Sequence, residues 1–413
     1  MNGIKGVILG VENVICQRGV VVPEVFQEVN KLITFFKKKG IDFVIHTNRS
    51  WYHEKNGKKE NLKDFLTNIW GNFDYLCYTE DFNLAPKPQA ASTANILRQK
   101  NWKATETLYI GASDSDMRTA VNGNILFLRA TWWNNSTDYG FEFATPKDIA
   151  RFIDTFCLRN HLWCHEIHDG NFNFYALAPF STMKPEYTLY SEDARSAAKN
   201  GLGHPDFWIG AIVSSLYFSG IHNQIDYVTV YPGHKVGYGN RVMNEAISIF
   251  GKCFRKKYLE DLIIRHSESK KSQTARNSGI PIDHLNQLNT IHLNEYPKKS
   301  NTEYYKKSPL GAGKTILVID DITTMGYSLE AARTYIEKTG ANVILASWLK
   351  TINRDIQRLA PLPNFNPYVA NKFTDVKVDK VYDYRQNITN ILAPEELTTI
   401  FNKFKDWDWD WES

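Results

Sequence analysis

Thr315-Ile-Leu-Val-Ile-Asp-Asp-Ile-Thr-Thr-Met-Gly-Tyr-Ser328 is the stretch of sequence that decides the fold of the C-terminal half. Residues 315–319 form a short apolar run with β-branched side chains, which predicts a buried strand. Two acids and a turn follow, and the spacing then predicts a helix over residues 328–339 with Gly340 at its C-terminal end. Strand, turn and helix with short connections indicate a parallel α/β sheet.

The same turn has the chemistry of a site for a phosphorylated sugar. Loop amides and the positive end of a helix dipole favour an anion such as phosphate. The hydroxyls of Thr324 and Ser328 add donors, and Gly326 lets the backbone approach a ligand. Asp320 and Asp321 would repel a phosphate but suit sugar hydroxyls, because each charge-assisted hydrogen bond contributes about 1.5–3 kcal/mol. We therefore expect a ligand that carries a sugar and a phosphate one ring apart.

This stretch resembles the loop with which type I phosphoribosyltransferases bind phosphoribosyl pyrophosphate (PRPP). The family pattern is an apolar strand, two aspartates and a turn, and the chain departs from it only at Met325, where the family often has a second threonine. The resemblance implies that Asp320 and Asp321 are catalytic and hold the ribose hydroxyls. It also implies that the 5-phosphate lies on the turn, which consists of Thr323, Thr324, Met325, Gly326, Tyr327 and Ser328.

Other positions resemble the ComF-like branch of that family. Residues 228–232 look like its pyrophosphate-holding strand and turn, and Arg241 and Asn244 keep two of the four residues of its Arg-Gly-Phe-Asn signature. Residues 265–277 resemble its flexible basic loop. The resemblance implies a pyrophosphate site made of Tyr231, Pro232, Gly233, Arg241, Arg265, Lys270, Lys271 and Arg276.

Metal binding is expected only through the substrate. The resemblance implies Mg²⁺ bound to PRPP, with no protein ligand predicted. Zinc is not expected, because Cys164 and His165 are neighbours on a predicted strand and would face opposite sides of it.

The N-terminal part alternates predicted strands and helices and carries polar residues where its strands end. These residues, with the glycine after the first strand, are Gly10, Glu12, Thr47, Asn48, Lys87 and Asp116. Their order and spacing resemble the haloacid dehalogenase (HAD) superfamily, whose members attack phosphate with an aspartate and hold Mg²⁺ with further acids.

Two departures from the HAD pattern remove the chemistry of that superfamily. Gly10 stands at the nucleophile position, and Ala112 replaces the first acid of the metal site. Without a carboxylate at position 10 no covalent phosphate intermediate can form, and one metal ligand is lost. We expect a catalytically inactive scaffold or protein-binding domain. A phosphate pocket retained by Thr47, Asn48 and Lys87 is the alternative.

Composition favours a globular cytoplasmic protein. The 49 basic and 45 acidic residues nearly cancel, so no nucleic-acid partner is indicated. Five scattered cysteines suggest reduced thiols rather than a disulfide framework. We find no apolar run long enough for a membrane span and no signal peptide before the first strand.

The 413 residues predict an α/β protein with two doubly wound parallel-sheet domains. A HAD-like Rossmannoid domain is expected over residues 1–145 and a phosphoribosyltransferase domain over 146–413. In the latter, the PRPP loop covers 316–328. A small hood, about 160–205 and including an aromatic-rich hairpin at 162–177, is expected to cover the acceptor.

Three functions compete. The first is transfer of ribose 5-phosphate from PRPP to a nucleobase or related nitrogen acceptor. The second is a PRPP- or nucleotide-binding sensor without turnover, and the third is a residual nucleotide phosphatase. The fusion also resembles nucleotide-processing proteins of bacterial stress and antiphage gene clusters. A protein partner on the HAD-like domain and a homo-oligomer stay open.

Overall fold

The computed structural model describes residues 3–55, 57–81, 83–133, 139–237, 239–270 and 283–411. The chain divides into two compact units. The first consists of Met1–Asn160, Cys253–Arg255 and Lys403–Ser413, and the second of His161–Lys252 and Lys256–Asn402. In the described ranges no helix is both long and apolar enough to cross a bilayer.

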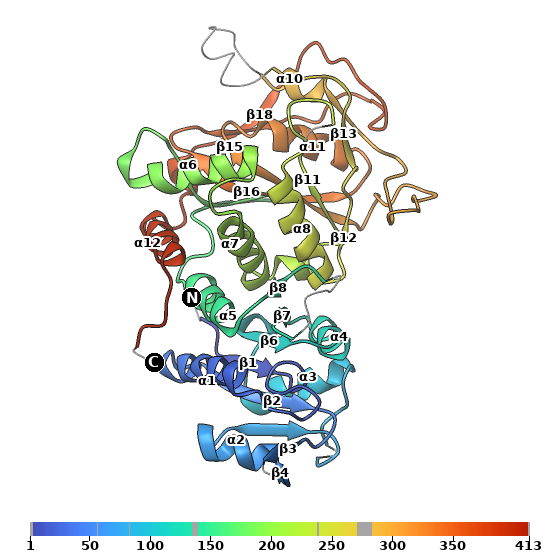
Figure 1. Ribbon diagram of the computed structural model, residues 1–413. Coiled ribbons are helices and arrows are strands. Elements are labelled where there is room, and N and C mark those ends of the chain that lie inside the picture. The colour runs from blue at the N-terminus through green and yellow to red at the C-terminus, as the bar shows by residue number, and fades with distance from the viewer. Residues whose placement is uncertain are drawn as a thin grey trace. The chain divides into compact units, whose positions relative to one another are not determined.

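The first unit is built on a parallel six-stranded sheet in the order β5-β2-β1-β6-β7-β8. All of these strands except β5 are labelled in Figure 1. Its central strand is buried at every position, as expected for a parallel sheet with both faces covered. The strands of this sheet are β1 (Gly6–Leu9), β2 (Asp42–Thr47), β5 (Asp74–Cys77), β6 (Thr107–Gly111), β7 (Leu126–Ala130) and β8 (Glu142–Phe143). A parallel α/β fold for this part of the chain is thereby confirmed.

Helices cover this sheet, and a small hairpin extends from it. The helices are α1 (Pro23–Lys38), α2 (Leu62–Trp70), α3 (Ala90–Lys100), α4 (Asp114–Asn122) and α5 (Pro146–Phe152), with the short turns η1 (Ala104–Glu106) and η2 (Ile153–Cys157). Helix α1 packs beside α5, and α3 beside α4. The hairpin pairs β3 (Tyr52–Lys55) with β4 (Lys58–Asn61).

The first unit continues past residue 145, where the sequence suggested a domain boundary. Helix α5 begins there, with Thr145 as its N-cap and Pro146 in its first turn. Phe152 of α5 packs edge-on against Phe141 and Phe143, with ring centroids 5.3 Å apart in both pairs. This aromatic packing holds α5 against β8.

The second unit contains a six-stranded sheet in the order β12-β11-β15-β16-β10-β9. All neighbours are parallel except β9 and β10, which form an antiparallel hairpin at one edge. The strands are β9 (His165–Asp169), β10 (Phe172–Phe180), β11 (Tyr227–Val230), β12 (Lys257–Tyr258), β15 (Thr315–Thr323) and β16 (Asn342–Thr351). Strand β15 lies inside the sheet, and its residues Ile316–Ile319 are fully buried.

Helices and two small hairpins complete the second unit. The helices are α6 (Pro185–Asn200), α7 (Pro205–Phe218), α8 (Arg241–Cys253), α10 (Leu285–Leu288), α11 (Tyr327–Glu337) and α12 (Ala393–Lys405), with the turns η3 (Ile221–Asn223) and η4 (Arg385–Asn387). The hairpins pair β13 (Ile263–Arg265) with β14 (Ile291–Leu293), and β17 (Ile356–Leu359) with β18 (Val378–Tyr382). Helix α11 packs on β15, β16 and β17.

The predicted aromatic hood is wrong in its main part. The hairpin expected there extends the central sheet instead, because β10 pairs in parallel with β16 from Asn173 to Phe180. Phe172 and Phe174 of this hairpin are each only 1% exposed and belong to the apolar core of the unit. They therefore cannot stack on an acceptor. Of the expected hood only α6 lies outside the sheet, beside β10 and β15.

Candidate functional site

Two acids close the central strand of the second unit. Asp320 and Asp321 lie at the carboxyl end of β15 and are partly exposed, in contrast to the buried residues before them. Their carboxylates accept hydrogen bonds from neighbouring backbone amides, Asp321 N to Asp320 Oδ1 at 2.9 Å and Ile322 N to Asp321 Oδ1 at 2.6 Å. Within the described part of the chain, no ion pair involves either acid.

Nearby cations and hydrogen bonds only partly offset the cost of charging these two carboxyl groups. Burial, followed by the charge of Asp321, raises the pKa of Asp320 well above its ordinary value, although Arg265 lowers it in part. Burial also raises the pKa of Asp321, against the amide of Ile322, the side chain of Asn240 and the charge of Lys199. Carboxyl groups held in this state are more frequent at functional sites than in ordinary structural positions.

The turn after the acids presents unsatisfied amides. Gly326 adopts φ +81° and precedes the first residue of α11, and a Cβ at this position would lie 3.1 Å from Ile356. No side chain caps the helix. The first amide to find a helical carbonyl is that of Glu330, which donates to Gly326 O at 2.8 Å. No acceptor among the described residues meets the amides of residues 326–329, so the donors at this helix N-terminus are free.

The hydroxyl groups of the turn differ in their contacts and in their exposure. Thr324 contacts Thr351 through their Oγ1 atoms at 3.0 Å and is partly exposed, as is Ser328. The ring of Tyr327 packs on His284, with centroids 4.3 Å apart. The Thr323 hydroxyl is buried without a hydrogen-bond partner, among apolar core side chains such as Phe174. The structure thus directs Thr323 into the core. Gly326 is buried as well, and the other residues of the turn are partly exposed.

Arg265 was predicted to cover a pyrophosphate on a flexible loop, and the structure contradicts this. Its side chain is 3% exposed and donates to Gly233 O at 2.7 Å, to Thr290 Oγ1 at 2.5 Å and to Gln287 Oε1 at 2.9 Å. The hydroxyl of Tyr231 donates to the same Gln287 oxygen at 2.8 Å. Arg265 and Tyr231 therefore support the turn at Gly233 from the protein interior. Neither directs its polar group toward a ligand.

The remaining predicted pyrophosphate residues are less engaged. Pro232 and Gly233 are partly exposed after β11, and Arg241 is exposed at the start of α8. Lys270 is exposed, and its backbone is held by the Asn286 side chain. Lys271 and Arg276 lie outside the described residues.

Three residues near the acids were not predicted. Lys199 and Asn240 both lower the pKa of Asp321, and Lys350 is buried behind the turn. Lys199 is at the end of α6, which belongs to the region of the expected hood. Nothing in the local sequence distinguishes these residues, because their proximity comes from the order of the strands.

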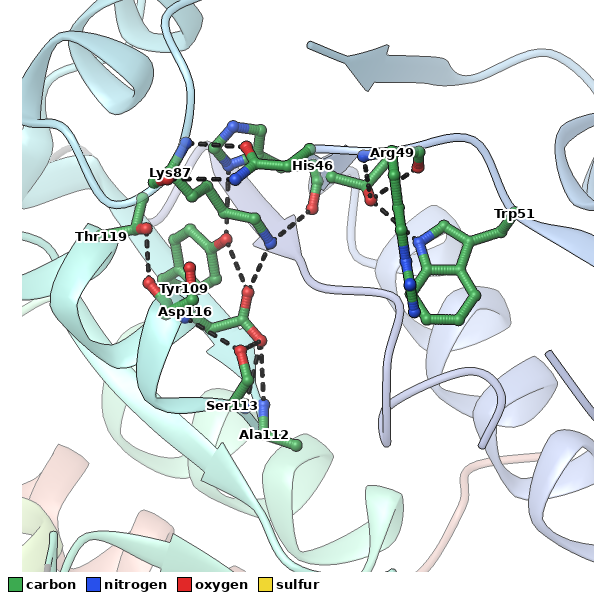
Figure 2. Close-up of polar contacts among 12 residues, drawn as sticks. His46, Arg49, Trp51, Lys87, Tyr109, Ala112, Ser113, Asp116 and Thr119 are labelled. Atoms are coloured by element: carbon green, nitrogen blue, oxygen red, sulfur yellow. Dashed lines mark hydrogen bonds and ion pairs between the residues drawn. The ribbon is translucent and has the colours of Figure 1, made fainter. Parts of the chain in front are cut away.

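The HAD-like centre of the first unit is a closed network around Asp116. Lys87 Nζ lies 2.6 Å from Asp116 Oδ1 and also donates to His46 O at 3.1 Å. Figure 2 shows that Tyr109 and Ser113 converge on the same carboxylate, at 3.2 and 2.7 Å through their hydroxyls. The side chains of Lys87 and Asp116 are only 9% and 2% exposed.

Asp116 is ionised in this network. Burial alone would raise its pKa, but the Lys87 ammonium and the hydrogen bonds from Ser113 outweigh burial and hold the pKa below its ordinary value. Burial, assisted by the Lys87 charge, lowers the pKa of His46 to about 3, so that imidazole is neutral. Each oxygen of Asp116 already accepts several donors, including the amide of Ala112 at 3.3 Å. The carboxylate therefore has little capacity left to bind a metal ion.

The residues expected to retain a phosphate pocket are bonded to one another. The Thr47 hydroxyl donates to Arg49 O at 2.9 Å and accepts from Trp51 Nε1 at 2.9 Å. The side chain of Asn48 donates from Nδ2 to Lys87 O, and its Oδ1 accepts from Lys87 N. These hydrogen bonds occupy the side-chain polar atoms of Thr47 and Asn48.

Glu12 and Gly10 complete the centre. Glu12 accepts from the amide of Arg18 at 3.0 Å and lies 3.6 Å from Arg49 Nη2. A Cβ on Gly10 would lie 2.9 Å from Asp116 Oδ2, which is closer than real Cβ contacts. The position of the missing nucleophile is thus partly filled by the carboxylate of Asp116.

Comparison with known proteins supports a HAD-like domain in the first unit. Residues 20–130 match the family model described as haloacid dehalogenase-like hydrolase. The matched region begins after Gly10 and Glu12, and it contains Thr47, Lys87 and Asp116. The N-terminal unit therefore carries a HAD-like domain. No curated protein matches the chain.

Solved structures with similarity to this chain include HAD-superfamily hydrolases. One from Ehrlichia chaffeensis is 14% identical, covers 37% of this chain and 98% of its own, and has a TM-score of 0.27. One from Geobacter sulfurreducens is 12% identical, covers 35% and 97%, and has a TM-score of 0.23. A provisionally named phosphoglycolate phosphatase from Lactobacillus delbrueckii is 18% identical over 31% of this chain, with a TM-score of 0.25. This chain spans about half of that protein, 53%.

Proposed function

We propose that the second unit binds PRPP at the turn after β15 and transfers its ribose 5-phosphate to a nitrogen acceptor, such as a nucleobase. One observation carries this proposal. Asp320 and Asp321 lie near the end of a central parallel strand and form no ion pair with a described residue, and the helix that follows begins with amides that meet no acceptor among those residues. Acids that suit sugar hydroxyls and amides that suit phosphate are thus adjacent in one turn.

The acids would act on charge that develops in the sugar. Departure of pyrophosphate leaves positive charge on the ribose ring, and carboxylates placed beside it stabilise that charge. Burial and then the charge of Asp321 raise the pKa of Asp320, so a positive charge that develops beside this pair is stabilised. Fixed backbone amides hold both carboxylates in place before the substrate binds.

Mg²⁺ fits this site as a companion of the substrate. In phosphate chemistry it keeps several waters and is held by one or two carboxylates together with substrate phosphates. Asp320 and Asp321 are two partly exposed carboxylates of that kind. When bound, the ion would neutralise charge on the leaving pyrophosphate.

A second candidate, PRPP binding without turnover, is favoured by the state of the basic residues. Arg265 is buried and fully engaged, so it cannot neutralise the leaving group. Arg241 and Lys270 are the exposed cations left among the predicted pyrophosphate residues in the described ranges. A sensor needs the sugar and phosphate contacts but not a complete pyrophosphate site.

Release of pyrophosphate separates the two candidates. The full chain would be incubated with PRPP, Mg²⁺ and a panel of nucleobases, and pyrophosphate would be measured by a coupled assay. A transferase releases pyrophosphate only when its acceptor is present. Binding of PRPP without release with any acceptor would favour the sensor, and failure to bind PRPP would refute both.

For the HAD-like domain we infer a structural or partner-binding role. Its nucleophile position is Gly10, and Asp116 is engaged by Lys87 and by further donors. Hydrolysis through an aspartyl-phosphate is therefore not expected. Phosphate release from nucleoside monophosphates by the purified chain, if abolished by Asp116→Asn, would contradict this inference.

A further inference from the structure

Lys350 lies directly behind the phosphate-binding turn. It is the residue before the last of β16, next in the sheet to β15, and its side chain is fully buried. Its ammonium donates to Thr324 O at 2.6 Å, to Thr351 O at 3.2 Å and to the carbonyl of Arg354. All three acceptors are neutral backbone carbonyls, and only the protonated side chain has a donor for each of them. The neutral amine has two N–H groups and leaves one carbonyl without a donor, so uptake of a proton completes these contacts. No ion pair of Lys350 is found among the described residues.

The contact with Thr324 sets the direction of the next amide. In a trans peptide the carbonyl of one residue and the amide hydrogen of the next point in opposite directions. Because Lys350 draws the Thr324 carbonyl into the protein, the Met325 amide points away from Lys350. The amides of residues 326–329, which also lack acceptors, follow it directly. Lys350 thus orients the first of these free backbone amides, that of Met325, from the buried side of the turn.

The surroundings of Lys350 contain little negative charge. Burial lowers its pKa to about 7, with Asp355 raising it and Arg354 lowering it further. The Tyr384 ring lies 5.5 Å from the ammonium, and that ring stacks on His165. Burial, then the Lys350 charge, lowers the pKa of His165 to about 4, so His165 is neutral near pH 7. An anion bound on the turn would be the nearest new charge to stabilise the ammonium.

We propose that Lys350 is a positioning residue of the phosphate-binding turn, which fixes the peptide between Thr324 and Met325 and takes up a proton when a phosphate ester binds. This inference rests on the proposed sugar-phosphate site. Lys350 does not touch the ligand. It acts through the Thr324 carbonyl and through its charge beneath the turn.

The test measures the uptake of protons on binding as well as the affinity. Ribose 5-phosphate is titrated into the full chain at pH 8 by calorimetry in buffers of different ionisation enthalpy. A sugar phosphate is already a dianion at this pH, because its second pKa is about 6. A group with a pKa of about 7 is mostly neutral at pH 8, so binding should bring uptake of up to about 0.9 proton.

Two variants complete the experiment. Lys350→Met should lose the proton uptake and bind ribose 5-phosphate about tenfold more weakly or worse. Lys314→Met is the matched control, because Lys314 precedes the opposite end of β15 and pairs with Asp226 at 3.0 Å. It should keep both the uptake and the affinity.

The outcomes separate this inference from the proposed function. Binding by the wild-type chain without proton uptake, or equal binding and uptake by Lys350→Met, would overturn the role of Lys350 and leave the sugar-phosphate site standing. Absence of binding by the wild-type chain would refute the site and this inference together. If Lys350→Met does not fold, Lys350→Arg decides, because its guanidinium stays charged at pH 8 and should bind without the proton uptake.

Discussion

Replacing Lys87 with methionine removes one partner of the buried ion pair in the HAD-like centre. Lys87 and Asp116 are 2.6 Å apart, with side chains 9% and 2% exposed. Loss of one member of a buried pair leaves an uncompensated charge and costs about 3–5 kcal/mol. We expect Lys87→Met to lower the stability of this unit by about that amount at pH 7.

The double variant Lys87→Met with Asp116→Asn should recover much of the loss, because no charge then stays buried. We expect it to be less stable than the wild type by about 1–2 kcal/mol, since the hydrogen bonds of Ser113 and Tyr109 meet an amide in place of a carboxylate. The difference between the single and double variants measures the buried charge directly.

In Lys87→Met the dependence of stability on pH should be the reverse of that in the wild type. In the wild type the folded pKa of Asp116 lies below its ordinary value, so its contribution to stability is present above the unfolded pKa and is lost as pH falls through the folded one. Without Lys87, burial dominates and raises the folded pKa above the unfolded one. Lys87→Met should therefore gain stability as pH falls from 7, over the range in which Asp116 becomes protonated.

Hydrogen exchange measured by mass spectrometry on peptides from β6 and α4 would follow this unit within the full chain. Lys31→Met is the control, because Lys31 forms a partly exposed pair with Glu28 at 2.8 Å within one helix and should contribute less than about 1 kcal/mol. A loss below about 1 kcal/mol for Lys87→Met, with unchanged pH dependence, would refute the view that this pair stabilises the centre.

Three further variants test other parts of the account. Gly10→Asp should not create phosphatase activity toward p-nitrophenyl phosphate and should destabilise the fold by at least about 2 kcal/mol, because its Cβ would lie 2.9 Å from Asp116 Oδ2. Thr323→Val should leave PRPP affinity within about twofold and keep or raise stability by about 1 kcal/mol, since its buried hydroxyl has no partner. Arg265→Met should lower the urea midpoint by the equivalent of about 2–4 kcal/mol, because Gly233 O loses a buried donor. An unchanged midpoint would instead fit a mobile arginine.

The sequence predicts much of the strand and helix order. Residues 315–319 lie within β15 as expected, a helix follows the turn, and the hairpin expected within 162–177 is present as β9 and β10. These features depend on local signals, such as an apolar run before a turn. The HAD-like region was recognised from the spacing of strand ends, which a parallel sheet brings to one edge.

What the sequence could not predict depends on strand order and burial. The aromatic hairpin was interpreted as a hood because alternating aromatics fit both a stacking surface and a core strand. Its pairing with β16 decides for the core. Arg265 is a residue type that often binds phosphate, and only its burial beside Gln287 shows a structural role. Lys350 has no local signal, since its partner Thr324 is on a neighbouring strand.

Calorimetric titration of PRPP with Mg²⁺ into the full chain tests the central proposal most directly. The wild type should bind, and the double variant Asp320→Asn with Asp321→Asn should lose measurable binding while remaining folded by circular dichroism. Asp375→Asn, an exposed acid of the same unit, is the control and should bind as the wild type does. Equal PRPP affinity in the wild type and the double variant would contradict the assignment of these two acids to the sugar.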